Sequence, residues 1–333
     1  MKSISLPQEV MRLLADGAHL LVNVSGGADS DAMLTQLWRL YQQNHPHAWP
    51  GSFTTIHSHL QRNEWPFTLP HIQRYVTELT GQPPVIVKRE KGDLLDRWWQ
   101  RYHTLQAQGR DVPPWSSAAA RFCTGEMKSQ VIHRWTRKHF PRNATVISAI
   151  GIRADESPAR ARKSVFHPET KASAPTKNRH VYRWLPIHDF TLADVWATLG
   201  WTLERLEALR TEVRTQIQPG DFEALQTVLD RWGYTANSVY ALNNDRCSCR
   251  LCVLASRNDL LNGIRWNPDH FRDLVELELA SGFGFQQGRW LADLCPELLT
   301  DDQRSRLVHV KAARASVGPP AKVLRGPQQL RLL

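Results

Sequence analysis

Residues 20–31 read LLVNVSGGADSD, an apolar run followed by a Ser-Gly-Gly turn and an acidic segment. We interpret this order as a buried strand, a phosphate-binding loop and the start of a helix. Gly26 and Gly27 provide the backbone freedom that lets a main chain approach a phosphate. Ser25 and Ser30 add hydroxyl donors at a helix N-terminus, which favours anions. The stretch therefore predicts a polyphosphate site, although Gly-Gly pairs also occur in ordinary turns.

The spacing Ser-Gly-Gly-x-Asp-Ser after a buried strand resembles the PP-loop family of adenine nucleotide alpha hydrolases. That family includes ATP pyrophosphatases and phosphoadenosine phosphosulfate (PAPS) reductases, and the chain lacks the Gly-x-x-x-x-Gly-Lys-Ser/Thr pattern of P-loop NTPases. The resemblance implies that Ser25, Gly26, Gly27, Asp29 and Ser30 form a nucleotide cradle. Many PAPS reductases carry lysine where this chain has Ala28, a difference that favours ATP as the substrate.

The pattern around the loop predicts an α/β fold. Apolar strand segments alternate with amphipathic helix segments along the first half of the chain, which indicates a parallel sheet flanked by helices. The resemblance implies that this sheet is Rossmann-like, of the PP-loop (HUP) type. From Phe190 the pattern becomes mostly helical. We expect three regions, a PP-loop nucleotide-binding domain at 1–190, a helical cap region with the cysteine cluster at 191–303, and a basic mobile tail at 304–333.

Composition narrows the class of protein and of partner. The 333 residues carry a formal net charge of +10, so nucleotides, DNA or RNA will be attracted to the surface. No apolar run approaches the roughly 20 residues of a membrane span, and the N-terminus lacks a signal-peptide core, so we expect a cytoplasmic protein without membrane contact. The tail either contacts nucleic acid or protein or is only solvated.

A second motif, Gly-Ile-Arg-Ala-Asp-Glu-Ser at residues 151–157, directly follows a predicted strand. From composition alone it fits a polar loop whose arginine pairs with a neighbouring carboxylate. It also resembles the Gly-x-Arg-x-x-Glu-Ser segment of PP-loop reductases and related sulfurtransferases, in which the arginine faces the nucleotide phosphates. The resemblance implies that Arg153 holds the alpha phosphate, that Glu156 orients Arg153, and that Ser157 lies at the nucleotide.

The cysteines predict a metal centre. Cys247, Cys249 and Cys252 lie within six residues, and Cys123 can supply a fourth thiolate. Their spacing fits zinc and a 4Fe-4S cluster equally. Residues 121–128 resemble the Arg-x-Cys-Thr-x-x-x-Lys segment of PAPS-reductase-like proteins, including the DNA phosphorothioation sulfurtransferase, where this cysteine binds an iron-sulfur cluster. The resemblance favours the 4Fe-4S cluster over zinc.

Four further expectations concern residues around these motifs. The resemblance makes Arg121 and Lys128 secondary candidates for phosphate contact, and Cys295 is expected to be structural. A basic stretch at 160–183 fits either a mobile loop that closes over phosphate or a solvated loop. His57 and His59 replace the acidic residue that the family commonly has after the second strand, and the sequence shows no further ligand for a metal beside them.

The resemblance implies an enzyme that cleaves ATP at the alpha phosphate, with Arg153 and Asp29 as catalytic residues and Asp29 contacting magnesium. Such cleavage would activate an acceptor, with DNA or RNA the leading choice, for sulfur transfer from a donor or partner protein. One alternative is a PAPS or APS reductase that produces sulfite, but the Glu-Cys-Gly-x-His segment of family reductases is absent. A second alternative is a non-catalytic nucleotide-sensing subunit of a larger complex.

Overall fold

A six-stranded sheet forms the centre of the computed structural model, which describes residues 2–317. Its strands are β1 (His19–Asn23), β2 (Phe53–Ser58), β3 (Val85–Val87), β4 (Thr145–Ile150), β5 (Phe166–Pro168) and β6 (His180–Trp184). They lie in the order β3-β2-β1-β4-β6-β5, all parallel except the edge strand β5, which is antiparallel to β6. This mostly parallel sheet, flanked by helices, confirms the predicted fold class.

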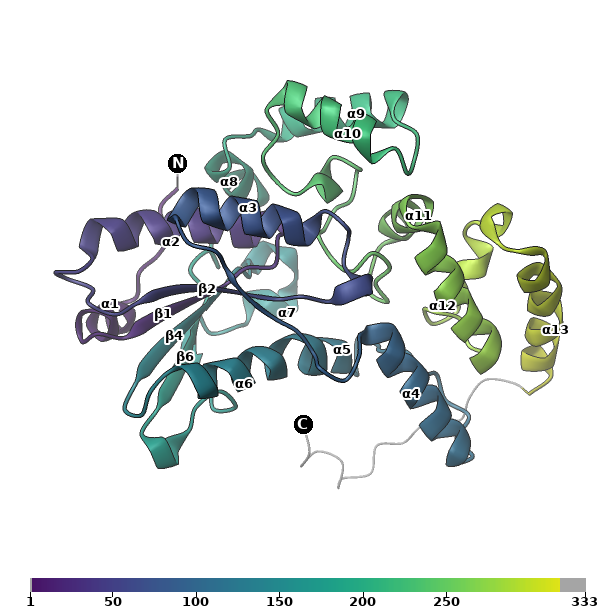
Figure 1. Ribbon diagram of the computed structural model, residues 1–333, viewed down its shortest axis with the longest axis horizontal. Coiled ribbons are helices and arrows are strands. Elements are labelled where there is room, and N and C mark those ends of the chain that lie inside the picture. Colours follow the sequence, from purple (N-terminus) through teal and green to yellow (C-terminus); the bar gives the residue numbers. More distant parts are fainter. Residues whose placement is uncertain (1, 318–333) are drawn as a thin grey trace.

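Helices cover both faces of the sheet, which explains why its central strand is apolar without alternation. In β1, Leu20 and Val22 belong to one buried cluster, and Leu21 belongs to another on the opposite face. Figure 1 shows α2 and α3 along one face and α6 along the other. The helices of this part are α1 (Gln8–Ala15), α2 (Ala28–Asn44), α3 (Thr68–Thr80), α4 (Leu94–Ala107), α5 (Phe122–Thr124), α6 (Gln130–His139) and α7 (Pro158–Ala161).

The second half of the described chain is helical, as the sequence predicts. Its helices are α8 (Leu192–Thr198), α9 (Leu203–Gln216), α10 (Phe222–Trp232), α11 (Arg257–Trp266), α12 (Pro268–Ser281) and α13 (Asp301–Val317). The capping box of Thr191 and Asp194 starts α8. No helix among the described residues is long and apolar enough to cross a membrane.

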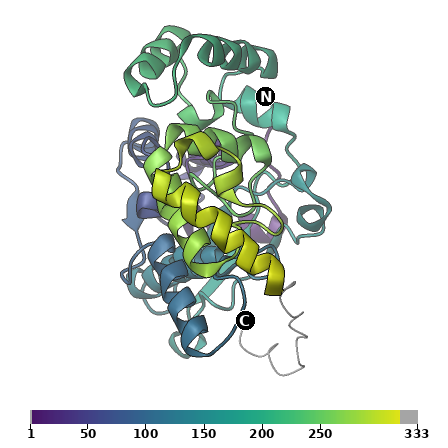
Figure 2. The same ribbon diagram turned by 90° about the vertical axis from the view of Figure 1, so that its right-hand side faces the viewer.

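The buried clusters group these helices differently from their order in the chain. Val195, Leu209 and Leu229, on α8, α9 and α10, share a cluster with β1 and α2 of the nucleotide-binding part. By contrast, α4 contributes Leu95 and Trp98 to a second cluster built mainly from α11 and α12. Figure 1 shows α4 beside the group formed by α11, α12 and α13, and Figure 2 shows that group from its outer side. The second core therefore joins residues that lie far apart in the sequence.

Two expectations about irregular segments need correction. Residues 304–317, expected to begin a mobile tail, belong to α13, where Leu307 and Val310 pack against the second core cluster. The remaining tail lies outside the described residues. The basic stretch at 160–183 is not irregular throughout, because it contains β5 and part of β6. Backbone hydrogen bonds between β5 and β6 at the edge of the sheet give this stretch its regular structure. Its many charged side chains hide the strand pattern in the sequence.

Glu278 on α12 stabilises the second core through an internal carboxylate. Its side chain is fully buried and accepts hydrogen bonds from the backbone N–H groups of Phe285 (2.7 Å), Leu291 (2.8 Å) and Ala292 (3.1 Å). Burial raises the pKa of Glu278 to about 7, although the three bonds act to lower it. The Glu278 carboxylate thus bonds three backbone positions of the segment that follows α12.

We expect Glu278→Ala to lower the free energy of unfolding by about 3 kcal/mol or more, because it leaves three buried donors without a partner. Glu276→Ala is the control on the same helix, since Glu276 is 38% exposed and its ion pair with Arg306 is worth less than about 1 kcal/mol. Urea unfolding curves measure both variants. Equal losses in the two variants would contradict the role assigned to Glu278.

Candidate functional site

The loop between β1 and α2 has the geometry expected of a phosphate-binding turn. Gly26 has a φ of +72°, in the left-handed region that glycine adopts without strain, and Gly27 is the residue before the first turn of α2. The carbonyl of Gly27 accepts hydrogen bonds from the backbone N–H groups of Ser30 (2.9 Å) and Asp31 (3.1 Å). The loop therefore leads directly into the N-terminus of a 17-residue helix, where the helix dipole favours an anion.

The two serines of the loop have different surroundings. Ser30 is buried, and its hydroxyl donates to the Gly27 carbonyl (2.8 Å) and accepts from the Ser25 backbone N–H (3.1 Å). Ser25 is exposed, and its hydroxyl lies 3.4 Å from the N–H of Gly27. Ser30 thus holds the shape of the loop, whereas the Ser25 hydroxyl is available to a ligand in solvent.

The segment after β4 lies against the start of α2. A Cβ added at Gly151 would be 3.0 Å from the Asp29 carbonyl oxygen, so only glycine allows this close approach without movement. Arg153 is 7% exposed, and its Nε donates to the Asp29 carboxylate at 2.8 Å while Nη1 donates to Asp155. The structure therefore brings Asp29 and Arg153 together at the carboxyl ends of β1 and β4, as the motif order predicts.

The Asp29 carboxyl is held in a strongly perturbed environment. Burial raises its pKa to about 6, against the lowering effect of the Arg153 charge and hydrogen bond, and the Glu156 carboxylate raises it further. A cation beside Asp29 would stabilise its ionised form. The pair can thus present both a guanidinium and a carboxylate beside the phosphate loop.

The expectation that Glu156 orients Arg153 needs correction. Glu156 pairs with Arg160 four residues later, on the helix that Ser157 caps through its hydroxyl, which accepts from the Arg160 N–H at 3.3 Å. Asp155 and Asp29 hold Arg153 instead. Glu156 ends η3 (Ala154–Glu156) directly before the cap of α7, so its carboxylate lies close to Arg160 in the first turn of that helix.

Three of the four candidate cysteine ligands lie near one another. The charge of Cys252 and that of Cys123 raise the pKa of Cys249, after the larger effect of burial, and Cys123 likewise raises the pKa of Cys252. The Lys128 ammonium is close enough to lower the pKa of both Cys249 and Cys252. Cys123 comes from α5 and the other two come from the segment before α11, so the group joins two distant parts of the chain.

Cys247 lies against the phosphate loop. A Cβ added at Gly27 would be 3.4 Å from the Cβ of Cys247, and the Asn237 amide donates to the Cys247 sulfur at 3.6 Å. Burial raises the pKa of Cys247 to about 12, and the charges of Glu64 and Asp31 raise it as well. The cysteine segment thus begins next to the predicted nucleotide cradle.

Two other basic candidates differ in their surroundings. Lys128 lies on η2 (Gly125–Ser129) and acts on all three cysteines of the segment, since its charge also lowers the pKa of Cys247. Arg121 is exposed at the start of α5, and its charge lowers the pKa of Cys252. Both cations therefore lie by the cysteines rather than on the phosphate loop itself.

Tyr240 is a residue of this site that the sequence did not single out. It is buried in η5 (Ser238–Tyr240), and its hydroxyl accepts a hydrogen bond from the Ala28 N–H at 2.9 Å. Ala28 is the first residue of α2, so this hydroxyl occupies a donor that a phosphate oxygen would also seek. No pattern around Tyr240 signals this contact, because 212 residues separate the two partners.

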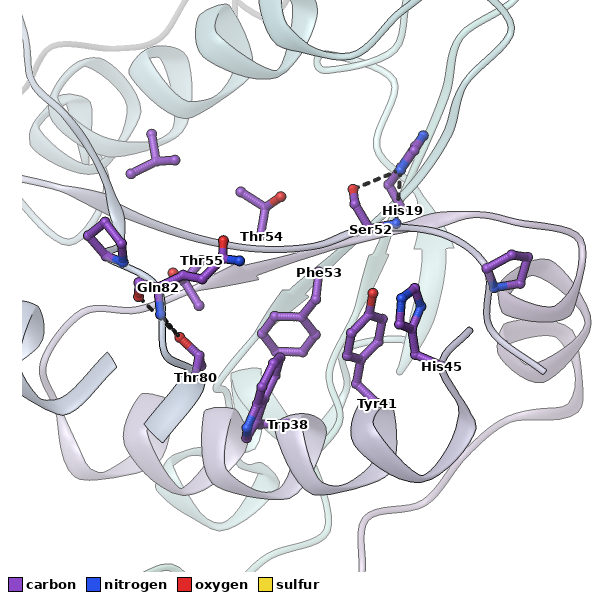
Figure 3. Close-up of a pocket in the computed structure, with 13 residues that line it drawn as sticks. His19, Trp38, Tyr41, His45, Ser52, Phe53, Thr54, Thr55, Thr80 and Gln82 are labelled. Carbon is purple, nitrogen blue, oxygen red and sulfur yellow. Dashed lines mark hydrogen bonds between the residues drawn. The ribbon is translucent and has the colours of Figure 1, made fainter. Parts of the chain in front are cut away.

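A cavity of about 660 Å³ lies away from the phosphate loop. Figure 3 shows Trp38 and Tyr41 of α2 facing Phe53, with His19 and Ser52 nearby. His19 and Phe53 are the first residues of β1 and β2, so the cavity is at the amino ends of the strands. In sheets of this type the ligand binds at the carboxyl ends, so we assign no nucleotide to this cavity.

His57, His59 and Glu64 form a group that the sequence analysis missed. Their ligand atoms all lie within 4.8 Å of one another, with Glu64 supplied by the turn after β2. The sequence offered the histidine pair but gave no reason to add a carboxylate five residues beyond it. Glu64 is close to the histidines in the sequence, but the backbone turn at Gln61 is what brings its carboxylate to them.

The parallel sheet, the glycine loop and the facing arginine together define a PP-loop nucleotide-binding protein. A family model for the phosphoadenosine phosphosulfate reductase domain matches residues 19–209, more than half of the chain. The chain therefore belongs to the phosphoadenosine phosphosulfate reductase family. No curated protein matches the chain. The matched range includes the phosphate loop, Cys123 and Arg153 and ends before Cys247.

We expect Gly26→Ala to lower the free energy of unfolding by about 2 kcal/mol and to weaken ATP binding. The positive φ costs an L-residue about 1–2 kcal/mol, and the new Cβ would lie 3.0 Å from Thr68 and 3.1 Å from Ile72. Gly81→Ala is a matched control, because Gly81 has a φ of +73° and open space around it. Calorimetric ATP binding and urea unfolding test both. Normal ATP affinity in Gly26→Ala would contradict the assignment of the loop.

Proposed function

We propose that this protein binds ATP and cleaves it between the alpha and beta phosphates, in support of sulfur transfer to a nucleic acid. The observation that carries the proposal is Arg153, buried and fixed by Asp29 at the carboxyl end of the sheet, beside the loop of Ser25 and Gly26. A guanidinium there matches phosphate oxygens in a bidentate manner and stabilises charge that develops on the alpha phosphate. The family assignment supports an adenine nucleotide as the ligand.

In this proposal each group at the loop has a separate task. The backbone of Gly26 and Gly27 and the hydroxyl of Ser25 bind the beta and gamma phosphates, and a phosphate oxygen replaces the Tyr240 hydroxyl at the Ala28 N–H. Asp29 contacts the magnesium ion that accompanies ATP, because a nearby cation stabilises the ionised form of its carboxyl. The magnesium ion in turn neutralises phosphate charge. Ser157 and Glu156 lie in the segment after β4, as Arg153 does, and complete the rim of the site.

The chemical step transfers the adenylyl group. A nucleophilic oxygen of the acceptor attacks the alpha phosphorus, the bond to the beta-phosphate oxygen breaks, and pyrophosphate leaves with both bonding electrons. A sulfur nucleophile then displaces AMP from the activated acceptor. The net charge of +10 supports DNA or RNA as the acceptor, and the sulfur comes from a donor or partner protein.

We further propose that Cys123, Cys247, Cys249 and Cys252 hold a 4Fe-4S cluster. A tetrahedral zinc ion with Zn–S bonds of about 2.3 Å keeps its sulfurs about 3.8 Å apart. Among the described residues, no three cysteine sulfurs all lie within 4.8 Å of one another. A cluster in which each thiolate binds a different iron holds its sulfurs farther apart, and this supports iron-sulfur over zinc. Such a cluster supplies redox or sulfur-transfer chemistry beside the phosphate loop.

A PAPS reductase is the second candidate, because the matching family model carries that name. Reduction requires a thiol that attacks the sulfate sulfur. Cys295, the one cysteine outside the proposed cluster set, is 1% exposed in the second core cluster and cannot reach a nucleotide without unfolding that core. This burial favours ATP cleavage over reduction.

Product analysis separates the candidates. Anaerobically purified protein would receive ATP or PAPS with magnesium in separate reactions, and the nucleotides would be resolved by chromatography. We expect AMP and pyrophosphate from ATP. Adenosine bisphosphate and sulfite from PAPS would overturn the proposal in favour of the reductase. Tight nucleotide binding without any product, altered by a partner, would instead indicate a nucleotide-sensing subunit.

A further inference from the structure

The turn after β2 places a carboxylate against two histidines in a largely buried setting. The Glu64 Oε2 atom lies 3.2 Å from the Nε2 of His57 and 2.5 Å from the Nδ1 of His59. The side chains of His57 and Glu64 are 3% and 6% exposed, and that of His59 is 22% exposed. Such burial is unusual for three polar side chains of this kind and requires an interaction that offsets the lost hydration.

The hydrogen bond on the far side of His57 fixes which ring atom carries the proton. His57 Nδ1 lies 2.9 Å from the carbonyl oxygen of Val24, which can only accept, so Nδ1–H is the donor. In a neutral imidazole, Nε2 then presents a lone pair toward the Glu64 carboxylate, which is also an acceptor. Two acceptors face each other at 3.2 Å, so a proton or a cation must lie between them.

The arrangement has the properties of a transition-metal site. Tetrahedral zinc with bonds of about 2.0–2.1 Å separates its ligand atoms by about 3.3 Å, close to the spacing of His57 Nε2 and Glu64 Oε2. The contact of His59 Nδ1 with Glu64 Oε2 is shorter, at 2.5 Å, and would lengthen when an ion binds between them. A ligating histidine that donates its other ring N–H to a backbone carbonyl is the usual outer-shell arrangement. Two imidazoles and one carboxylate suit a first-row divalent ion and leave a fourth position open.

The surroundings connect this group to the rest of the site. Val24, which accepts from His57, directly precedes the phosphate-loop residue Ser25. On the other side, the Arg250 side chain donates to the backbone carbonyl of Glu64, and the Arg250 N–H donates to that of Asn63 at 2.9 Å. The group thus lies between the phosphate loop and the cysteine segment. An ion bound there would link the two, through the contacts of His57 with Val24 and of Glu64 with Arg250.

We propose that His57, His59 and Glu64 bind one divalent transition-metal ion of the zinc class, in a site separate from the cysteines. This inference does not depend on ATP cleavage or on the cluster. The alternative is a metal-free hydrogen-bonded network in which a second proton on His57 bridges to Glu64. The two possibilities differ in metal affinity, which can be measured without any activity.

Cobalt(II) is a suitable probe, because thiolate ligands give it an intense charge-transfer band and nitrogen and oxygen ligands do not. The experiment uses the full chain carrying Cys249→Ser and Cys252→Ser, stripped of metal by a chelator, and titrates cobalt and zinc against a chromophoric competitor. We expect one ion per chain without a thiolate band. His59→Gln and Glu64→Gln should each weaken binding by about 100-fold or more, beyond the 10- to 100-fold typical of outer-shell changes.

His71→Gln provides the matched control. His71 is also a buried histidine paired with a carboxylate, that of Asp31 at 2.7 Å, but it belongs to no three-ligand group among the described residues. Its variant should retain full metal affinity. Circular dichroism checks folding, and His59→Gln decides the result if Glu64→Gln does not fold, because His59 is the most exposed of the three. Absent binding, or binding unchanged in His59→Gln, would overturn the proposal.

Discussion

Arg153→Ala is expected to lower the rate of ATP cleavage by about 10²- to 10³-fold, the usual cost of removing one fixed donor from a developing negative charge. Arg153 is 7% exposed and bound by Asp29 and Asp155, so its guanidinium is oriented before any ligand arrives. Because the group acts on charge that grows during the reaction, the loss should fall mainly on kcat. Steady-state kinetics with ATP and magnesium measures it.

Two further variants make this result specific. Arg153→Lys keeps the charge but loses the planar fork, and we expect it to recover only part of the rate. Arg162→Ala removes an exposed arginine from the end of α7 on the same segment, and it should leave the rate within about twofold of the original. If Arg153→Ala folds normally and turns over at the rate of Arg162→Ala, Arg153 is not the phosphate clamp.

If the four cysteines hold the proposed 4Fe-4S cluster, Cys249→Ser is expected to abolish it, with loss of its visible absorption and of about four irons and four sulfides per chain. Cys249 lies where the charges of Cys252, Lys128 and Cys123 all reach it, so it is central to the group. Anaerobic purification with iron and sulfide analysis measures the change. The same iron and sulfide analysis of Cys123→Ser tests whether Cys123, on α5, also binds the cluster.

Cys295→Ala is the control for this series, because Cys295 is a buried member of the second core and lies outside the proposed ligand set. It should keep the full iron content, even if removal of the buried thiol lowers stability by about 1 kcal/mol. If the anaerobically purified protein contains zinc instead of iron, and Cys249→Ser loses that zinc, then the cysteines form a zinc site and not an iron-sulfur cluster. Iron unaffected by Cys249→Ser would contradict both forms of the assignment.

Short-range sequence patterns predicted the elements that form within one short stretch of the chain. The strand at β1, the turn at Gly26 and the helix α2 follow from apolar burial, a left-handed glycine and a helix start within one short stretch. The pairing of β1 with β4 then brings Arg153 to Asp29, because parallel strands end at the same edge of the sheet. Both the fold class and the family are confirmed.

Contacts between distant segments account for what the sequence did not predict. The backbone turns sharply at Gln61, with a φ of +56°, and returns Glu64 to the histidines of β2. Tyr240 reaches the start of α2 across 212 residues. In both cases the partner is selected by tertiary packing, which leaves no periodic signal in the sequence.

The central claim, cleavage between the alpha and beta phosphates, is tested most directly with two ATP analogues that each carry a methylene group in place of one bridging oxygen. The account predicts that the β,γ-methylene analogue is still cleaved to AMP, whereas the α,β-methylene analogue gives no product. Mass spectrometry of the nucleotides distinguishes these outcomes. If the β,γ-methylene analogue is inert while ATP yields ADP and phosphate, the reaction is at the gamma phosphate and the account is wrong.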